Sequence, residues 1–249
     1  MAKSGHTAHE QTLGGMLGSA EAFLKDLRFP NGAFEPAGDW RQTYLIWLIG
    51  RNSCIGTIQL ARTRIGDETF RLDVDWAVLQ NAKSMHRIRA SITCLCDRLA
   101  TPIGWTMQTR LHSPDGAAIE GASGDEEAAC RKGVTTIAGR KAKAGQKALG
   151  PWTSNFCLLE LVQRLGNGPV DPLEFTLLDF LTTRKDGHSL AYHGRQEALL
   201  GGRKVPLIGY CHLGNGVLPE VYWLDEHQRL RIVVSGLRAY VAGEKEVPA

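Results

Sequence analysis

The sequence predicts a mainly β protein of the β-rich α+β class. We expect a curved antiparallel sheet, a half-barrel or barrel, with one or two short helices packed on the concave side. Three observations predict this fold. Apolar and polar residues alternate at a period of two, short extended runs recur about every ten residues between turn signals, and no βαβ rhythm is visible. We expect a single domain over residues 1–249, because strands on both sides of a central segment belong to one sheet.

The N-terminal part of the chain, residues 1–39, is expected to be a helical and extended arm. Ser19 is placed to cap a short helix that Pro30 ends. Beyond this arm the pattern becomes that of strands, with a continuous apolar run over 44–49 and a second extended segment over 54–60.

The clearest strand signal lies in residues 70–78, where five apolar side chains occupy alternate positions. After a four-residue polar turn the alternation resumes over 86–96, which predicts an antiparallel hairpin. The polar face of this hairpin carries Asp73, Asp75, Arg87, Arg89, Ser91 and Thr93. Depending on the register, the two aspartates lie across from Arg87, Arg89 or Ser91.

The central segment, residues 121–149, is rich in Gly, Ala and Lys and shows little periodicity. We interpret it as a flexible loop inserted in the sheet. A short amphipathic helix follows, capped at 153–155 and ended by Gly166, and it is expected to plug the concave side or an open end of the sheet.

The remaining third of the chain reads mostly as short strands. Residues 173–181 are ambiguous between helix and strand. Four extended runs follow, over 189–196, 204–212, 221–224 and 230–234. Tyr240 and Val241 end the last of them after an expected bulge at 235–236.

Composition is that of an ordinary globular protein. A net charge of +3 with 43% apolar and 22% charged residues excludes a disordered chain. The positive excess lies largely in 121–149 without interleaved aromatics, so we expect no nucleic-acid partner. No apolar run is long enough to span a membrane and no signal peptide is visible. We expect a cytoplasmic protein, or a periplasmic one if Met1 replaces a removed signal peptide.

The six cysteines show no C-x-x-C spacing. Cys94 and Cys96 lie in an apolar run, and we expect them to be buried, inert thiols. The sequence leaves the disulfide state of the six open.

The order of long strands, a variable middle, one inserted helix and a closing meander resembles bacterial lipoprotein carriers, the LolA/LppX-like proteins. The stretch VYWLDEHQRLRIVVSG, residues 221–236, carries most of the similarity. The resemblance implies an antiparallel half-barrel whose concave pocket binds lipids or other apolar molecules. It assigns no functional residue.

Several chemistries find no support in the sequence. Phosphate-binding loops and zinc motifs are absent, and we predict no cofactor. Gly187–Ala191 nearly matches a nucleophile elbow, with Asp225 and His227 downstream of Ser189 in the order of a hydrolase triad. A polar stretch before Ser189 and strand-like residues after it favour a β-turn instead.

The polar face of the hairpin admits two interpretations. If this face points outward, its aspartates and arginines form solvated cross-strand ion pairs that contribute little to stability. Lining a pocket, the carboxylates supply acid or base groups and the guanidiniums hold an anionic substrate. The outward interpretation is favoured.

Two histidines in adjacent predicted strands, His193 and His212, are candidates to share a cavity. A histidine or carboxylate beside a tyrosine in an apolar pocket suffices for cofactor-free acid–base chemistry. Metal binding through these two histidines and Glu220 has no supporting spacing rule, and we predict no metal.

The expected function is binding of an apolar or aromatic small molecule in the concavity of the half-barrel. The candidate ligand-binding residues are Trp76, Arg87, Arg89, Trp105, Tyr210, Tyr222 and Trp223. The alternative is a cofactor-independent lyase, isomerase or hydrolase in the same pocket, with Asp73, Asp75, His193 and His212 as acid–base groups. No motif identifies a reaction, so the sequence leaves open whether the protein is an enzyme. An open sheet edge would also allow self-association.

Overall fold

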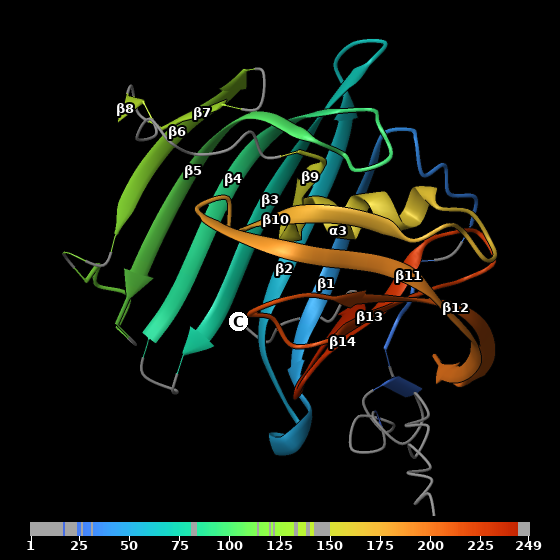
Figure 1. Cartoon of the computed structure of the whole chain (residues 1–249). Helices are drawn as coiled ribbons and strands as arrows, with labels where there is room; N and C mark the ends of the chain where they lie inside the picture. The colour runs from blue at the N-terminus through green and yellow to red at the C-terminus, as the bar shows by residue number, and fades with distance from the viewer. Residues whose placement is uncertain are drawn as a thin grey trace, which may run out of the picture.

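The computed structural model describes residues 17, 24–25, 27–30, 32–80, 84–113, 115–119, 121, 123–131, 134–137, 140–141 and 150–243. It confirms the predicted class, a mainly β fold with one short α-helix on the concave side of a curved sheet (Figure 1). The strands of the first half are β1 (Trp40–Leu48), β2 (Ser53–Arg64), β3 (Thr69–Gln80), β4 (Ser84–Leu95), β5 (Pro102–His112), β6 (Gly124–Arg131), β7 (Val134–Ile137) and β8 (Arg140–Lys141). The second half holds β9 (Trp152–Ser154), α3 (Asn155–Leu161), β10 (Leu173–Asp179), β11 (Thr183–Leu200), β12 (Arg203–Leu213), β13 (Glu220–Leu224), β14 (Leu230–Ser235) and β15 (Arg238–Ala242). Short 3₁₀ turns, η2 (Ile49–Arg51) and η3 (Val162–Arg164), follow β1 and α3.

All described strands belong to one sheet in the order β8-β7-β6-β5-β4-β3-β2-β1-β15-β14-β13-β12-β11-β10-β9. Neighbours are antiparallel except β9 and β10, which are parallel. In the first half, β1 to β8 lie side by side in chain order. In the second half, β15 to β9 continue the sheet on the other side of β1, in reverse chain order. The two halves join where β1 pairs with β15, with Tyr44 opposite Ala242. Among the described strands β8 and β9 are the edges and do not pair, so the sheet is an open barrel that curves around α3 (Figure 1).

The concave side is the main core. The alternating residues of β3 and β4 that the sequence pattern assigned to one face, such as Leu72, Val74 and Ile92, are buried there together with α3. All residues of α3 except Asn155 are buried. Its N-cap is Ser154, whose Oγ accepts from the backbone N–H of Cys157 at 3.2 Å, as the predicted capping sequence requires.

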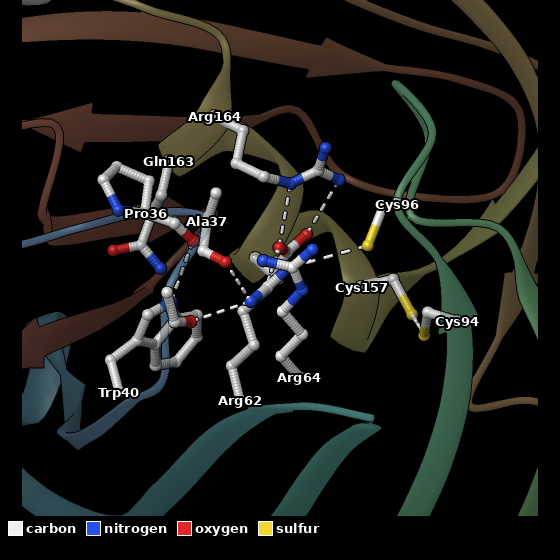
Figure 2. A network of polar contacts seen from close by, with 12 residues as sticks. Pro36, Ala37, Trp40, Arg62, Arg64, Cys94, Cys96, Cys157, Gln163 and Arg164 are labelled. Atoms are coloured by element: carbon white, nitrogen blue, oxygen red, sulfur yellow. Dashed lines mark hydrogen bonds and ion pairs between the residues drawn. The ribbon is translucent and has the colours of Figure 1, made fainter. Parts of the chain in front are cut away.

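A buried polar network joins α3 to the sheet (Figure 2). Glu160 accepts a hydrogen bond from Arg62 Nε of β2 at 2.9 Å and bonds from Arg164 at 2.8 and 3.0 Å. The Arg62 guanidinium also lies 4.3 Å from the centre of the Phe70 ring and donates to the backbone oxygens of residues 37 and 38. Because one carboxylate meets two guanidiniums in a dry site, the helix has one preferred position on the sheet.

A second apolar cluster lies on the outer face of β12–β15 and β1. Side chains of these strands pack there against the N-terminal arm and the far end of β11. The cluster consists of Leu17, Leu24, Leu27, Leu45, Trp47, Ala198, Leu200, Leu207, Trp223, Ile232, Val234, Ala239 and Val241. The second half of the sheet is therefore covered on both faces, whereas the outer face of β2–β5 is polar.

Two local expectations differ from the structure. The described part of 121–149 contains β6, β7 and β8, where a loop was expected, because the hairpin extends the sheet edge through backbone pairing that needs no apolar periodicity. Residues 142–149 and the expected helix after Ser19 lie largely outside the described residues. The expected bulge at 235–236 is instead a tight turn between β14 and β15, with Gly236 at φ 56°. The ambiguous segment 173–181 is strand β10.

Candidate functional site

A small cavity lies on the concave side between α3 and the sheet. Its volume is about 50 Å³. Residues from β2, β3, α3, the β10–β11 turn and β13–β15 line it, namely Ile58, Trp76, Asn155, Phe156, Leu159, Phe180, Glu220, Tyr222, Val233 and Tyr240. Its walls are therefore mostly aromatic and aliphatic, with one carboxylate and two phenol groups.

Phe180 covers this cavity from the β10–β11 turn. Its ring packs edge-on against Trp76 at 5.9 Å and Phe156 at 5.7 Å between ring centres. Phe180 as a whole is 36% exposed, so it lies between the cavity and solvent. Phe180 and Leu181 have φ angles of 48° and 61°, a left-handed conformation that is costly for bulky side chains. A hydrogen bond of 2.8 Å from the Phe180 N–H to Asn155 Oδ1 holds the turn against α3.

Glu220 provides the charged group of the cavity. Its Oε2 accepts from the Tyr222 hydroxyl at 2.7 Å and lies 3.4 Å from His212 Nδ1. Burial alone would raise the pKa of this carboxyl, but hydrogen bonds from His212 and Tyr222 outweigh burial and lower it below the ordinary value. Burial, reinforced by the Glu220 charge, raises the pKa of Tyr222 well above its ordinary value. Glu220 is therefore an anion at neutral pH, and Tyr222 keeps its proton.

The polar chain continues from Glu220 through two buried imidazoles. His212 Nε2 lies 2.9 Å from His188 Nδ1, and both rings lie roughly parallel to the Phe175 ring. If His212 Nδ1–H donates to the carboxylate, its Nε2 accepts, and His188 must donate through Nδ1. His188 Nε2 is then unprotonated and carries a lone pair. This buried atom has no hydrogen-bond partner among the described residues. Burial, together with the nearby His212, lowers the pKa of His188, which keeps the ring neutral.

His188 also lines a second pocket, at the sheet edge where β9 pairs with only part of β10. This pocket has a volume of about 520 Å³. Its lining residues are Pro151, Glu174, Phe175, Thr176, Gly187, His188 and Ser189. The Glu220–His212–His188 chain therefore connects the small aromatic cavity with this wider pocket.

The structure divides the predicted ligand-binding aromatics among three places. Trp76 and Tyr222 line the small cavity. Trp105 and Tyr210 are buried elsewhere on the concave side, Trp105 against Trp152 and Tyr210 through hydrogen bonds to the backbone oxygens of Gly166 and Gly168. Trp223 belongs to the outer apolar cluster, where exposed His193 packs edge-on against it.

The polar face of the β3–β4 hairpin lies on the outside of the sheet. Asp75 stands opposite Arg89 and Asp73 opposite Ser91. Asp75 also accepts from Arg87, with 2.8 Å to Nε, and Asp73 accepts from Arg71. A groove of about 360 Å³ on this face is lined by Asp73, Asp75, Arg89 and Ser91 together with Arg41, Gln59, Thr106 and Gln108. Burial opposes ionisation of Asp75, but the bonds from Arg87 and Arg89 prevail and lower its pKa.

The predicted acid–base groups are consequently not brought together in one pocket. Asp73 and Asp75 lie on the outer face, His212 lies on the inner face, and His193 is exposed on the outside. Alternation along a strand explains this separation, because strand residues of odd and even number point to opposite faces. His212 pairs with Leu190 and shares its inner face, whereas His193 lies at the bulge that follows Tyr192 in β11.

The hydrolase-like triad does not form. Asp225 Oδ1 accepts from the backbone N–H groups of His227 and Arg229 at 2.9 Å each, and Oδ2 accepts from Arg231 at 2.7 Å. Asp225 therefore organises the turn between β13 and β14 and does not orient an imidazole. Among the described residues no group of three or more His, Cys, Asp or Glu side chains is placed to hold a metal ion.

Sequence reasoning missed Phe156, Phe175, Phe180 and His188 as site residues. In the sequence, His188 stood out only as the variable position in Gly187–Ala191, the segment that nearly matches a nucleophile elbow. Its role depends on the 24-residue separation from His212 that the β11–β12 pairing bridges, and single-sequence periodicity does not give that register. Phe180 lies in a turn with positive φ, for which its residue type gives no signal.

The comparisons with known proteins add a likeness in overall shape. No protein-family model matches the sequence, and no curated protein matches it. Among solved structures the chain is similar to the crystal structure of a β-barrel-like protein of domain of unknown function DUF1849 from Brucella abortus. The TM-score is 0.49 at 10% sequence identity, over 83% of this chain and 95% of that chain. No helix in the described part of the chain is long and apolar enough to cross a membrane.

Proposed function

We propose that the protein binds a small aromatic or apolar molecule carrying one hydrogen-bond donor, in the cavity beneath Phe180. The observation that carries this proposal is the combination of aromatic walls with a single ionised carboxylate, Glu220. Ligand sites are typically apolar pockets with a few placed polar groups. A carboxylate only accepts hydrogen bonds, so the matching ligand group is an N–H or O–H donor.

The cavity is too small for such a ligand unless Phe180 moves. Its volume of about 50 Å³ is far below the roughly 300 Å³ at which small-molecule pockets begin. Movement of Phe180 would enlarge the cavity, because its ring lines the cavity and its turn is conformationally strained. An aromatic ligand that displaces this ring would take over its contacts with Trp76 and Phe156. A carrier role of the kind the LolA/LppX-like resemblance implies would use the same concave side.

The test compares 2-naphthol, which has an O–H donor, with naphthalene, which has none, by isothermal titration. We expect 2-naphthol to bind more tightly. Phe180→Gly should tighten its binding at least several-fold, since glycine tolerates the positive φ and leaves the site open. Glu220→Gln should weaken 2-naphthol binding by about tenfold, as one charge-assisted hydrogen bond becomes neutral.

The matched control is Glu197→Gln, a change of the same kind at an exposed position of β11 that lines neither pocket, which should leave the affinity unchanged. Equal binding of both probes, or no effect of Phe180→Gly, would contradict the proposal. Native mass spectrometry of the freshly purified protein adds an independent readout, because a co-purifying small molecule is expected.

A second candidate function is acid–base catalysis at His188. It is favoured by one observation, the unpartnered Nε2 at the end of a carboxylate–imidazole–imidazole chain. In this arrangement Glu220 and His212 orient His188, whose neutral ring presents Nε2 to take a proton from a substrate or water in the 520 Å³ pocket. Asp73 and Asp75 play no part in this version, since they lie on the other face.

Hydrolysis of p-nitrophenyl acetate tests this candidate. His188→Gln should abolish the protein-dependent rate, and Glu220→Gln should lower it and shift its pH profile. His227→Gln replaces an exposed histidine and should change nothing. Equal rates for the wild type and His188→Gln would exclude His188 as the base.

A further inference from the structure

Two buried thiols lie in contact between α3 and the sheet. Cys94 is on the concave face of β4 and Cys157 is in the first turn of α3 (Figure 2). Their sulfur atoms are 3.6 Å apart, and both side chains are fully buried. Both elements are held independently of the sulfurs. The Ser154 cap fixes the start of α3, and the Arg62–Glu160–Arg164 network fixes its middle.

We propose that Cys94 and Cys157 form a disulfide under oxidising conditions, which locks α3 covalently onto β4. A disulfide needs about 2.0 Å between the sulfurs, so the pair must close by roughly 1.5 Å. Small rotations of two cysteine side chains supply a movement of this size without a change of the fold. Among the described residues the other free thiols offer no such pair: Cys54 is exposed, Cys96 is exposed and not buried as the sequence pattern predicted, and Cys211 is on β12.

The chemistry is exchange with a low-molecular-weight disulfide such as oxidised glutathione. One cysteine, as its thiolate, attacks a sulfur of the oxidant and releases one glutathione thiolate, leaving a mixed disulfide. The second cysteine then attacks the protein-bound sulfur and releases the other. The two protein thiols lose two electrons and two protons, and the oxidant is reduced to two thiols.

Burial decides when this reaction occurs. It raises the pKa of Cys94 well above its ordinary value, so the folded protein holds few reactive thiolates, and oxidants have no access to the site. The bond therefore forms during folding in an oxidising medium and resists reduction once α3 has docked. A chain folded in a reducing medium keeps both thiols.

The lock should stabilise the protein substantially. The two cysteines are 63 residues apart in sequence, and the loop between them contains β5–β9. Closing a loop of this length restricts the unfolded chain strongly. Arg62–Glu160 is one of the polar contacts between the helix and the sheet, and a covalent bond at the first turn would hold the helix even when that ion pair is broken.

The experiment refolds the denatured full chain in a mixture of oxidised and reduced glutathione. We expect an intact mass lower by two hydrogen atoms, a proteolytic peptide pair linking Cys94 to Cys157, and a melting temperature about 5–10 °C above that of the chain refolded with a reductant. Cys54→Ala should retain the reductant-dependent difference. The double variant Cys94→Ala/Cys157→Ala should lose it.

Refolding from the denatured state exposes all thiols to the oxidant, so a missing disulfide cannot be attributed to burial of the cysteines. Free thiols at both positions after oxidative refolding would overturn the proposal. A linkage to Cys96 or another cysteine, or an oxidised form less stable than the reduced one, would overturn it as well. If the alanine pair fails to fold, the mass and peptide map of the wild type decide alone.

Discussion

At the scale of single residues, the candidate site depends on one close approach. A Cβ built on Gly214 would lie 2.0 Å from His188 Nδ1 and 2.4 Å from its Cε1 and Cγ. The missing side chain is therefore what allows the His188 ring to reach His212. The need for glycine here comes from contact with a ring 26 positions earlier in the chain, since the φ angle of Gly214 is not positive.

Gly214→Ala should consequently destabilise the protein by about 1–3 kcal/mol, the usual cost of overfilling a packed site. Urea unfolding followed by tryptophan fluorescence measures this change. Gly168→Ala is the matched control, because its Cβ would meet nothing within 4 Å and its φ is not positive, so little change is expected. Equal losses for the two variants would show that the His188 contact is absent in solution.

A second residue-scale prediction concerns pH. Burial lowers the pKa of folded His188 below the ordinary 6.5. As the pH falls through about 6.5, the unfolded chain therefore takes up a proton that the folded chain refuses, and the free energy of unfolding decreases. Stability should be greatest above about pH 7 and decline below about pH 6.5, by at most about 1.4 kcal/mol per pH unit for this one group.

Urea titrations between about pH 5.5 and pH 7.5 measure this decline. His188→Gln should flatten it. Some slope should remain, because burial also lowers the pKa of His86. The exposed His227→Gln variant should keep the full slope. An unchanged slope in His188→Gln would show that another group titrates.

At the scale of secondary-structure elements, α3 is attached to the sheet by a buried carboxylate, Glu160, between two arginines. Glu160 and Arg62 have side chains 0% and 2% exposed, and Arg164 adds a second guanidinium. Removing the carboxylate leaves two cations facing each other in a dry site. Glu160→Gln should therefore cost about 3–5 kcal/mol of unfolding free energy, measured by denaturant titration.

The control for this prediction is an ion pair at the surface. Arg64 and Asp67 are 3.3 Å apart with side chains 60% and 101% exposed, so Asp67→Asn should cost less than about 1 kcal/mol. A similar small effect of Glu160→Gln would mean that apolar packing alone positions the helix.

The elements also show what the sequence could predict. Period-two alternation identified β3 and β4, because one face is apolar and the other carries the aspartates and arginines. Ser154 identified the start of α3 by its capping chemistry. Strands β6–β8 escaped detection, because the apolar alternation that marks a half-buried strand is missing there. The site itself was predicted only in part: Trp76, Tyr222 and His212 were named, but the residues they contact were not. Those residues lie on strands distant in sequence, and the local pattern of a single strand does not give the pairing register.

At the scale of the whole molecule, the topology predicts one cooperative unit. Each half of the sheet is a local meander, but β1 is shared, since it pairs with β2 on one side and β15 on the other. The α3 helix follows β9 of the second half in sequence and binds Arg62 of the first half. Two independent domains would require a boundary crossed by few contacts, and here a paired strand and the main core cross it.

We therefore expect a single thermal transition in differential scanning calorimetry, with the calorimetric and van't Hoff enthalpies in agreement. Tryptophan fluorescence and far-ultraviolet circular dichroism should report the same midpoint, because Trp76 and Trp105 lie in the first half and Trp223 in the second. The Glu160→Gln variant sharpens the test. If the halves are coupled mainly through β1, it should melt at a lower temperature but still in one step. Two resolved transitions in the variant would mean that α3 supplies the coupling, and two in the wild type would refute the single-domain interpretation.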